Sequence, residues 1–117
     1  MRFMVIVKAT EDSEKGAMPG QDMLEAMGAY NEELVKAGVM LDGDGLRPSS
    51  YGARVRFDDE GNASVIDGPF AETREVLCGF IFIEAADAED ALRIAESIPM
   101  ARYGSIEVRP ELDIRGG

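Results

Sequence analysis

Two short apolar runs, each followed by a helical pattern, constrain the fold of this chain more than any other feature. Residues 2–8 (RFMVIVK) are rich in β-branched and aromatic side chains, and residues 80–83 (FIFI) are apolar without alternation. Runs of this kind are typical of strands in the centre of a sheet. The chain therefore contains two strand–helix units.

The first helical pattern predicts a helix over residues 22–37. The side chains that recur at spacings of three and four, and so share one face, are Met23, Met27, Tyr30 and Leu34. Asp22 and Glu25 resemble a capping pair, and Gly38 is placed to end the helix in a left-handed turn.

The second helix is expected to open at Asp87 and to stop before Pro99. Further strand segments are predicted at residues 39–46, 53–57, 63–66 and 105–109. Residues 53–57 alternate apolar and charged side chains, and a turn-rich connection leads to 63–66. These two segments are expected to form a solvent-facing hairpin.

The resulting order is strand, helix, strand, hairpin, strand, helix, strand. Two strand–helix–strand units with right-handed crossovers, interleaved in one sheet, give a ferredoxin-like α+β fold. Two helices cover only one face of such a sheet, so we expect a homodimer that pairs the other face with its copy. A length of 117 residues fits one domain, residues 1–117, with 113–117 as a frayed tail.

Composition excludes several classes of partner and chemistry. The net charge is −11, from 23 acidic and 12 basic side chains, so neither nucleic acid nor an anionic membrane surface is expected as a partner. The chain has no histidine, which removes Ser-His and Cys-His triads and the usual zinc and iron ligand sets. We expect no metal and no cofactor.

The location of the protein is predicted to be cytoplasmic. No apolar stretch approaches the ~20 residues of a membrane span, and the Met1-Arg2-Phe3 start does not resemble a secretory signal. The single cysteine, Cys78, has no partner for an internal disulfide and is expected to be a buried, inert thiol.

Three stretches together resemble the YCII-related family in its DGPF subgroup. They are MGAYNEELVKAGVMLDGDGLRPSSYGARVRF, DGPFAETREVLCGF and GSIEVRP, which occur in that order across nearly the whole chain. The resemblance implies a dimeric α/β barrel of two ferredoxin-like subunits. It also implies a poorly defined biochemical role, with an extracytoplasmic-function sigma factor as a partner of some members. An enzymatic role linked to a His-Asp pair in some relatives does not carry over, because histidine is absent.

The segment Asp67-Gly68-Pro69-Phe70 has two interpretations. Glycine and proline favour a fixed turn in which Asp67 accepts backbone hydrogen bonds and Phe70 is held in the core. Alternatively, the turn holds the Asp67 carboxylate at the rim of a pocket, where it acts as a general base or binds a cationic group.

Other side chains are candidates for the same pocket. Glu72 and Glu75 are close enough in sequence to join Asp67, although Arg74 offsets their charge. Arg47 is suited to hold a carboxylate ligand, and Tyr30 to present its hydroxyl to a cavity. The alternatives are a surface salt bridge for the arginine and a core position for the tyrosine.

The segment 41–46 (LDGDGL) lacks the further oxygen ligands of a calcium loop and is interpreted as a tight turn. Two classes of function remain open. One is a dimeric module that binds a small molecule or a protein in bacterial signalling. The other is a cofactor-independent enzyme on a small polar or aromatic substrate, with Asp67 as base and with Arg47, Tyr30 and Glu72 as binding residues.

Overall fold

The computed structural model describes residues 1–16, 20–72, 76–99 and 105–112, so the expected tail at 113–117 lies outside the described residues. The strands are β1 (Arg2–Lys8), β2 (Met40–Gly45), β3 (Ala53–Phe57), β4 (Ala63–Asp67), β5 (Leu77–Glu84) and β6 (Ile106–Pro110). The helices are α1 (Glu11–Glu14), α2 (Gln21–Lys36), the 3-10 helix η1 (Ser49–Tyr51) and α3 (Ala88–Glu96). Among the described residues, no helix combines the length and apolarity that crossing a bilayer requires.

The main sheet is antiparallel and has the strand order β2-β5-β1-β6. The two most apolar strands, β1 and β5, occupy its centre, as their sequences predicted. The strands of the two strand–helix–strand units interleave, because β5 lies between β1 and β2. The fold is therefore of the α+β class with antiparallel sheets.

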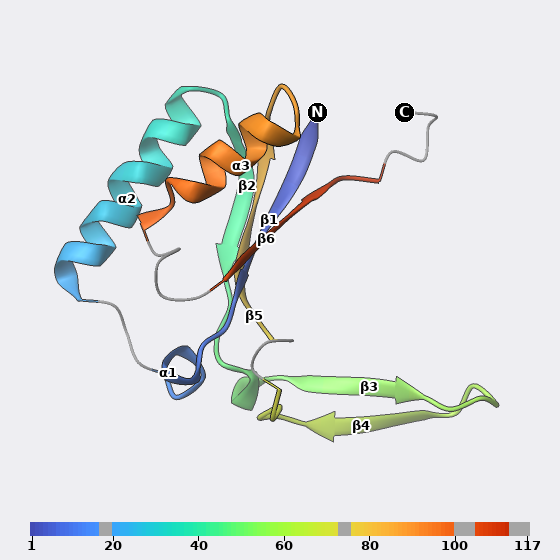
Figure 1. Ribbon diagram of the computed structural model, residues 1–117. Coiled ribbons are helices and arrows are strands. Elements are labelled where there is room, and N and C mark those ends of the chain that lie inside the picture. Colours follow the sequence, from blue (N-terminus) through green and yellow to red (C-terminus); the bar gives the residue numbers. More distant parts are fainter. Residues whose placement is uncertain (17–19, 73–75, 100–104, 113–117) are drawn as a thin grey trace.

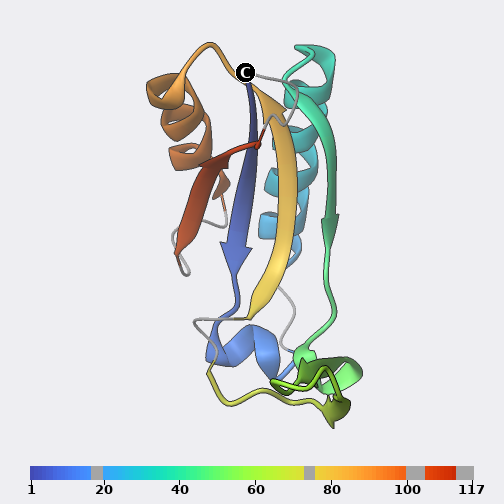
Figure 2. The same ribbon diagram turned by 90° about the vertical axis from the view of Figure 1, so that its right-hand side faces the viewer.

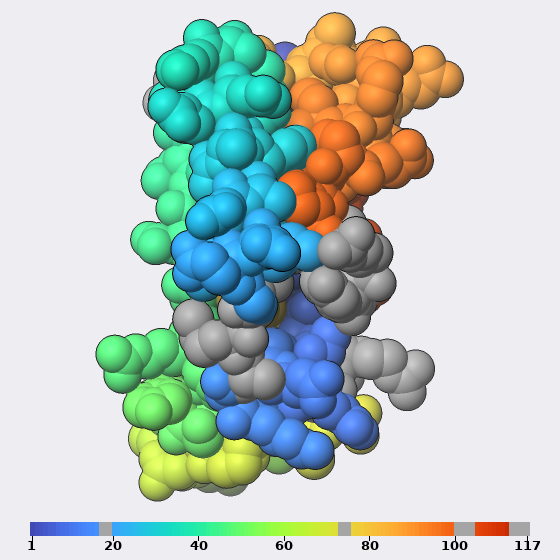
Figure 3. Space-filling view, turned by 90° about the vertical axis from the view of Figure 1, so that its left-hand side faces the viewer, coloured from blue at the N-terminus to red at the C-terminus, as the bar shows by residue number. Residues whose placement is uncertain are grey.

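Both long helices pack on the same face of the main sheet (Figure 1), and Figure 3 shows α2 and α3 side by side over that face. The buried residues that form the core there are Phe3, Val5, Ile83, Ala85, Ala91, Ala95 and Ile98. Asp87 caps α3 by accepting a hydrogen bond from Asp90 N at 2.8 Å, as expected. Gly38 ends α2 with a φ of 72°, also as expected.

The second face of the main sheet, here called the open face, carries the alternate side chains of the central strands. Because Phe3 and Val5 point to the helices, Met4 and Ile6 point away from them. Their cross-strand partners are Phe82 and Phe80, so four large apolar side chains lie together. Among the described residues no helix lies over this face (Figure 2).

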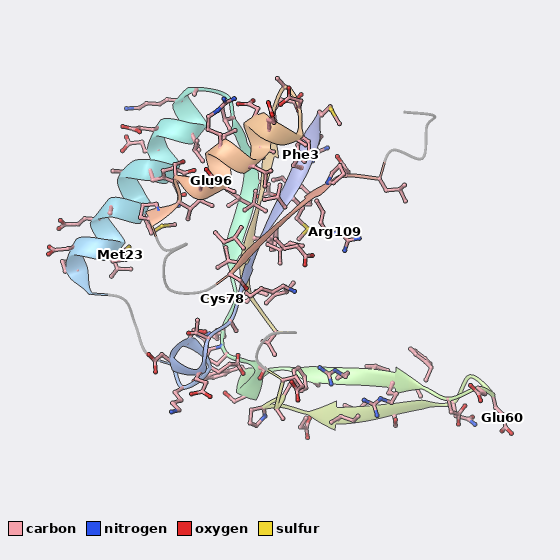
Figure 4. All side chains as sticks on the ribbon, in the orientation of Figure 1. Phe3, Met23, Glu60, Cys78, Glu96 and Arg109 are labelled. Carbon is pink, nitrogen blue, oxygen red and sulfur yellow. The ribbon has the colours of Figure 1, made fainter. Side chains whose placement is uncertain are left out.

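Strands β3 and β4 form a separate two-stranded sheet that projects from one end of the main sheet. This hairpin, residues 53–67, is here called the arm. It extends on the open-face side, away from the helices (Figure 1), and is seen nearly end-on in Figure 2. The turn at its tip is held by Asp58 Oδ1, which accepts hydrogen bonds from Glu60 N and Asn62 N at 2.9 Å. The predicted solvent-facing hairpin is confirmed, and Glu60 marks its tip in Figure 4.

Three local predictions were wrong. The 41–46 segment is no turn, because Asp42–Gly45 lies in strand β2 and pairs with β5. Asp22 does not cap α2, whose N-cap is Gly20 without a side-chain hydrogen bond. Cys78 is half-buried rather than buried.

The first loop also contains an unpredicted helix, α1. Its start is a capping box in which Thr10 Oγ1 accepts from Ser13 N and Ser13 Oγ accepts from Thr10 N. The sequence signal was present, but four residues are too few to show a helical period.

Candidate ligand pocket at the root of the arm

A pocket of about 520 Å³ lies where the arm joins the main sheet. Its walls come from residues 46–49 and 51–52, which include Ser49 and Tyr51 of η1, from Arg54 in the arm, and from Phe70, Val76 and Leu77. Segments far apart in the sequence therefore meet at this point. The volume is within the ~300–1,000 Å³ range of small-molecule sites.

The DGPF segment builds one wall of the pocket. Gly68 packs so closely on the backbone of the η1 turn that a Cβ there would lie 2.6 Å from the Ser49 carbonyl carbon. Gly68 N donates to the Gly52 carbonyl oxygen at 3.0 Å. The Gly68–Pro69 peptide bond is cis, and the next residue, Phe70, lines the pocket. The segment thus clamps the hairpin root onto the η1 turn.

Ser49 is the polar centre of this clamp and is 7% exposed. Its hydroxyl donates to the Glu14 carboxylate, and its backbone N donates to the other oxygen of that carboxylate at 2.9 Å. Ser49 Oγ in turn accepts a hydrogen bond from Phe70 N at 2.9 Å. One serine therefore joins α1, η1 and the DGPF segment. Sequence reasoning missed it because its three partners are distant along the chain.

Two guanidinium groups line the pocket, and each lies over an aromatic ring. Arg47 Cζ is 5.1 Å from the centroid of the Tyr51 ring, and Arg54 Cζ is 4.2 Å from that of Phe70. Stacking of this kind holds a guanidinium in place while its N–H groups remain able to donate in the plane. Neither arginine forms an ion pair within the part of the chain that the structure describes.

This arrangement suits a small anion with a flat apolar part. Both charged residues that line the pocket are arginines, whereas the whole chain carries a net charge of −11. A carboxylate at 4 Å from a guanidinium gains about 4 kcal/mol at an effective dielectric constant of ~20. The aromatic rings and the aliphatic walls provide the apolar contact. Among the described residues, no group of three or more cysteine, aspartate or glutamate side chains is arranged to hold a metal.

The structure places the predicted binding residues in different regions. Arg47 lines the pocket. Tyr30 lies between the helices, where its hydroxyl donates to the Ile94 carbonyl oxygen at 2.7 Å and lies 3.0 Å from Ser97 Oγ. Burial raises the pKa of Tyr30 above its usual 10.0. Its hydroxyl thus joins α2 to α3.

Asp67 is exposed at the end of β4, opposite Ala53 in the ladder. Its carboxylate accepts no hydrogen bond among the described residues, so it is not occupied by its own turn. Because side chains alternate along a strand, Asp67 lies on the arm face opposite to that of Arg54. Glu72 is exposed as well, while Arg74 and Glu75 lie outside the described residues. A role of Asp67 in catalysis, or of Glu72 in binding, stays a prediction.

Sequence reasoning also missed Arg54. The alternation of residues 53–57 predicted only a solvent-facing hairpin, and it gave no sign that this guanidinium packs on the Phe70 ring. The strand register pairs Arg54 with Ile66. The guanidinium packs on the ring of Phe70, which follows Ile66 by four residues.

Fold and pocket together define a class: a small α+β protein with both long helices on one face of its main sheet and a ligand-sized pocket at the base of a hairpin. The sequence matches the model of the YCII-related domain over residues 1–115, and the protein belongs to the YCII-related family. It is 37% identical over 90 residues to an uncharacterised protein of Rhizobium meliloti (strain 1021), covering 75% of this chain and 72% of that one.

A solved structure has a similar fold. It is 5-chloro-2-hydroxyhydroquinone dehydrochlorinase (TftG) from Burkholderia phenoliruptrix AC1100, in complex with 2,5-dihydroxybenzoquinone. The TM-score is 0.54 with 18% sequence identity, and the match covers 98% of this chain and 97% of the other. At this identity the likeness shows the fold alone.

Proposed function

We propose that this protein is a small-molecule-binding module whose ligand is a small organic anion held by Arg47 and Arg54. The observation that carries the proposal is the pair of ring-stacked guanidiniums lining one pocket. Resemblance to the DGPF subgroup supports a role in bacterial signalling, in the cytoplasm, with an extracytoplasmic-function sigma factor as the partner.

The chemistry of the pocket selects among anions. A bidentate carboxylate or a pair of phenolate oxygens matches the fork of donors that a guanidinium presents. The pocket is also lined by Tyr51 and Phe70 and by aliphatic side chains, so an aromatic or otherwise planar ligand body fits better than a compact inorganic ion. Aromatic carboxylates are therefore the ligands to test first.

The test compares benzoate and salicylate with neutral benzamide by isothermal titration calorimetry. Binding should be saturable for the anions, absent for the amide and weaker at higher salt. Arg47→Gln and Arg54→Gln should each reduce affinity at least tenfold, which corresponds to ~1.4 kcal/mol. Arg56→Gln is the matched control, because it makes the same charge change on the arm outside the pocket lining. Equal losses in all three variants would mean that general charge, not this pocket, attracts the anion.

A second candidate function is a cofactor-independent enzyme acting on a small polar or aromatic substrate with Asp67 as general base. Two observations favour it: the fold is shared with a dehydrochlorinase, and the exposed Asp67 carboxylate accepts no hydrogen bond among the described residues. Substrate would have to reach the arm face that carries Asp67. If the protein turns over a phenolic or quinone compound, Asp67→Asn should abolish turnover and leave anion binding at Arg47 unchanged. Turnover that survives in Asp67→Asn would remove this candidate.

The assembly that we propose is a homodimer in which two open faces pack together, as in a dimeric barrel of ferredoxin-like subunits. Support comes from Met4, Phe80 and Phe82, which lie partly exposed on that face beside the buried Ile6. Sheets that pack in this way bury side chains that would otherwise contact water.

A further inference from the structure

The arm has one apolar face that the other described residues leave exposed. The cross-strand register places Ala53, Val55 and Phe57 of β3 on the same face as Ala63 and Val65 of β4. The exposed fraction is 53% for Val55, 67% for Phe57 and 68% for Val65. The opposite face carries Arg54, Arg56, Ser64 and Ile66. One face is thus apolar along its whole length up to Asp67.

A hairpin with such a face is not expected to stand alone in water. Two-stranded hairpins are marginal by themselves and become stable when a further layer covers their apolar side. Neither β3 nor β4 pairs with any other described strand. The arm is nevertheless ordered at both ends, by the Asp58 turn at the tip and by the Gly68–Gly52 hydrogen bond at the root. An arm whose backbone is held at both ends and whose apolar face is exposed is suited to bind another surface.

The direction and length of the arm identify what covers it. The arm projects on the same side as the open face (Figure 1). Two sheets packed face to face lie ~10 Å apart, whereas a strand of five residues spans ~17 Å. An arm of this length therefore reaches beyond the plane of any second sheet that covers the open face. It must run alongside that second molecule.

The size of the arm surface also matters. Three half-exposed to two-thirds-exposed side chains offer on the order of 100 Å² each, so the arm alone contributes roughly 300 Å² per copy. A stable interface needs about 800 Å² per partner, which the arm cannot supply by itself. Arm and open face lie on the same side of the molecule (Figure 1). A two-fold pairing of identical copies is the arrangement that covers both surfaces in both molecules.

We infer that the arm of each copy packs its apolar face, formed by Val55, Phe57 and Val65, against the body of a second copy of this chain. This contact requires the pairing of open faces proposed above. It adds a second contact in each direction, in which the arm of one copy packs on the body of the other. Each copy carries a net charge of −11, so the two molecules repel and apolar burial must hold them together. Added salt should consequently strengthen the dimer, in contrast to the anion binding of the pocket.

The test is sedimentation velocity at micromolar concentration on four proteins. The wild type and Ser64→Asp should both be dimeric, because Ser64 lies on the polar face of the arm. Phe57→Asp and Val65→Asp should weaken the dimer at least tenfold and shift the population toward monomer. Both side chains are exposed in the single chain, so the variants should keep the wild-type far-ultraviolet circular dichroism spectrum.

A photo-crosslinking residue with an apolar side chain provides a second measurement that introduces no charge into the interface. Placed at position 57 or 65, it should yield a covalent dimer, and placed at position 64 it should not. A monomeric wild type would overturn both the face pairing and the arm contact. Dimers that persist in Phe57→Asp and Val65→Asp, or equal crosslinking from position 64, would overturn the arm contact alone.

Discussion

Replacement of Gly68 by alanine should be among the most damaging small changes to this protein. A Cβ at this position would lie 2.6 Å from the Ser49 carbonyl carbon and 3.2 Å from Ser50 N, and closer still to the Ser49 carbonyl oxygen. Backbone atoms cannot rotate away as the end of a flexible side chain does. The DGPF segment and the η1 turn would therefore have to move apart.

The magnitude follows from what that movement breaks. The Gly68–Gly52 hydrogen bond and the Phe70–Ser49 hydrogen bond lie on either side of the contact, at 3.0 Å and 2.9 Å. Each contributes about 0.5–1.5 kcal/mol, and overpacking adds about 1–3 kcal/mol. The expected loss is roughly 2–6 kcal/mol, which lowers the melting temperature by ~10 °C or more in a domain of this size.

Thermal and urea unfolding, followed by circular dichroism, measure this loss. Gly28→Ala is the control, because Gly28 is an exposed position inside α2 and a Cβ there meets nothing within 4 Å. That change should stabilise the helix by about 0.5–1 kcal/mol. A Gly68→Ala protein within ~0.5 kcal/mol of the wild type would refute the reasoning that close backbone packing explains this glycine.

The remaining predictions concern hydrogen bonds that join distant segments. Ser49→Ala should lower the free energy of unfolding by ~1–3 kcal/mol, because it leaves Phe70 N without its acceptor, whereas Ser50→Ala on the exposed neighbour should change little in the same urea titration. Tyr30→Phe should cost ~0.5–1.5 kcal/mol at pH 7 through loss of the bond to Ile94, and a stability that does not change would contradict the role given to this hydroxyl. Because burial raises the pKa of folded Tyr30 above its usual 10.0, the stability contributed by the neutral hydroxyl is fully present below that pH and is lost as the pH rises through the higher folded pKa. The difference in urea stability between wild type and Tyr30→Phe should therefore shrink above pH 10, and a difference that grows would contradict the sign.

Much of the fold could be predicted because the hydrophobic pattern of each segment agrees with the place of that segment in the sheet. The apolar runs in β1 and β5 are central strands, and the alternation in β3 identifies a hairpin outside the main sheet. Gly38 and Asp87 act where the general rules of helix ends place them.

The errors arose where tertiary contacts override local preference. Asp42–Gly45 has the composition of a turn, yet it pairs with β5, and Gly43 is required there because a Cβ would lie 2.6 Å from Ile81 Cγ2. No local signal identifies that neighbour. Tyr30 had two interpretations, a hydroxyl at the cavity or a core position, and in the structure its hydroxyl donates to the Ile94 carbonyl oxygen of α3.

The sequence predicted some of the residues that line the pocket and missed others. Arg47 and the DGPF segment were recognised as candidates, and both contribute to the walls. Arg54 and Ser49 were not, because their importance depends on contacts with Phe70 that only the folded chain creates. The segment that was read either as a turn or as a site is a clamp that forms one wall of a candidate site.

The most direct measurement of the central claim is a titration of the 15N-labelled protein with benzoate, followed through the arginine Nε–Hε signals. The account predicts saturable shifts of the Arg47 and Arg54 signals with one common dissociation constant, while the Arg56 signal stays in place. Shifts spread evenly over all arginines, or none at millimolar benzoate, would contradict it.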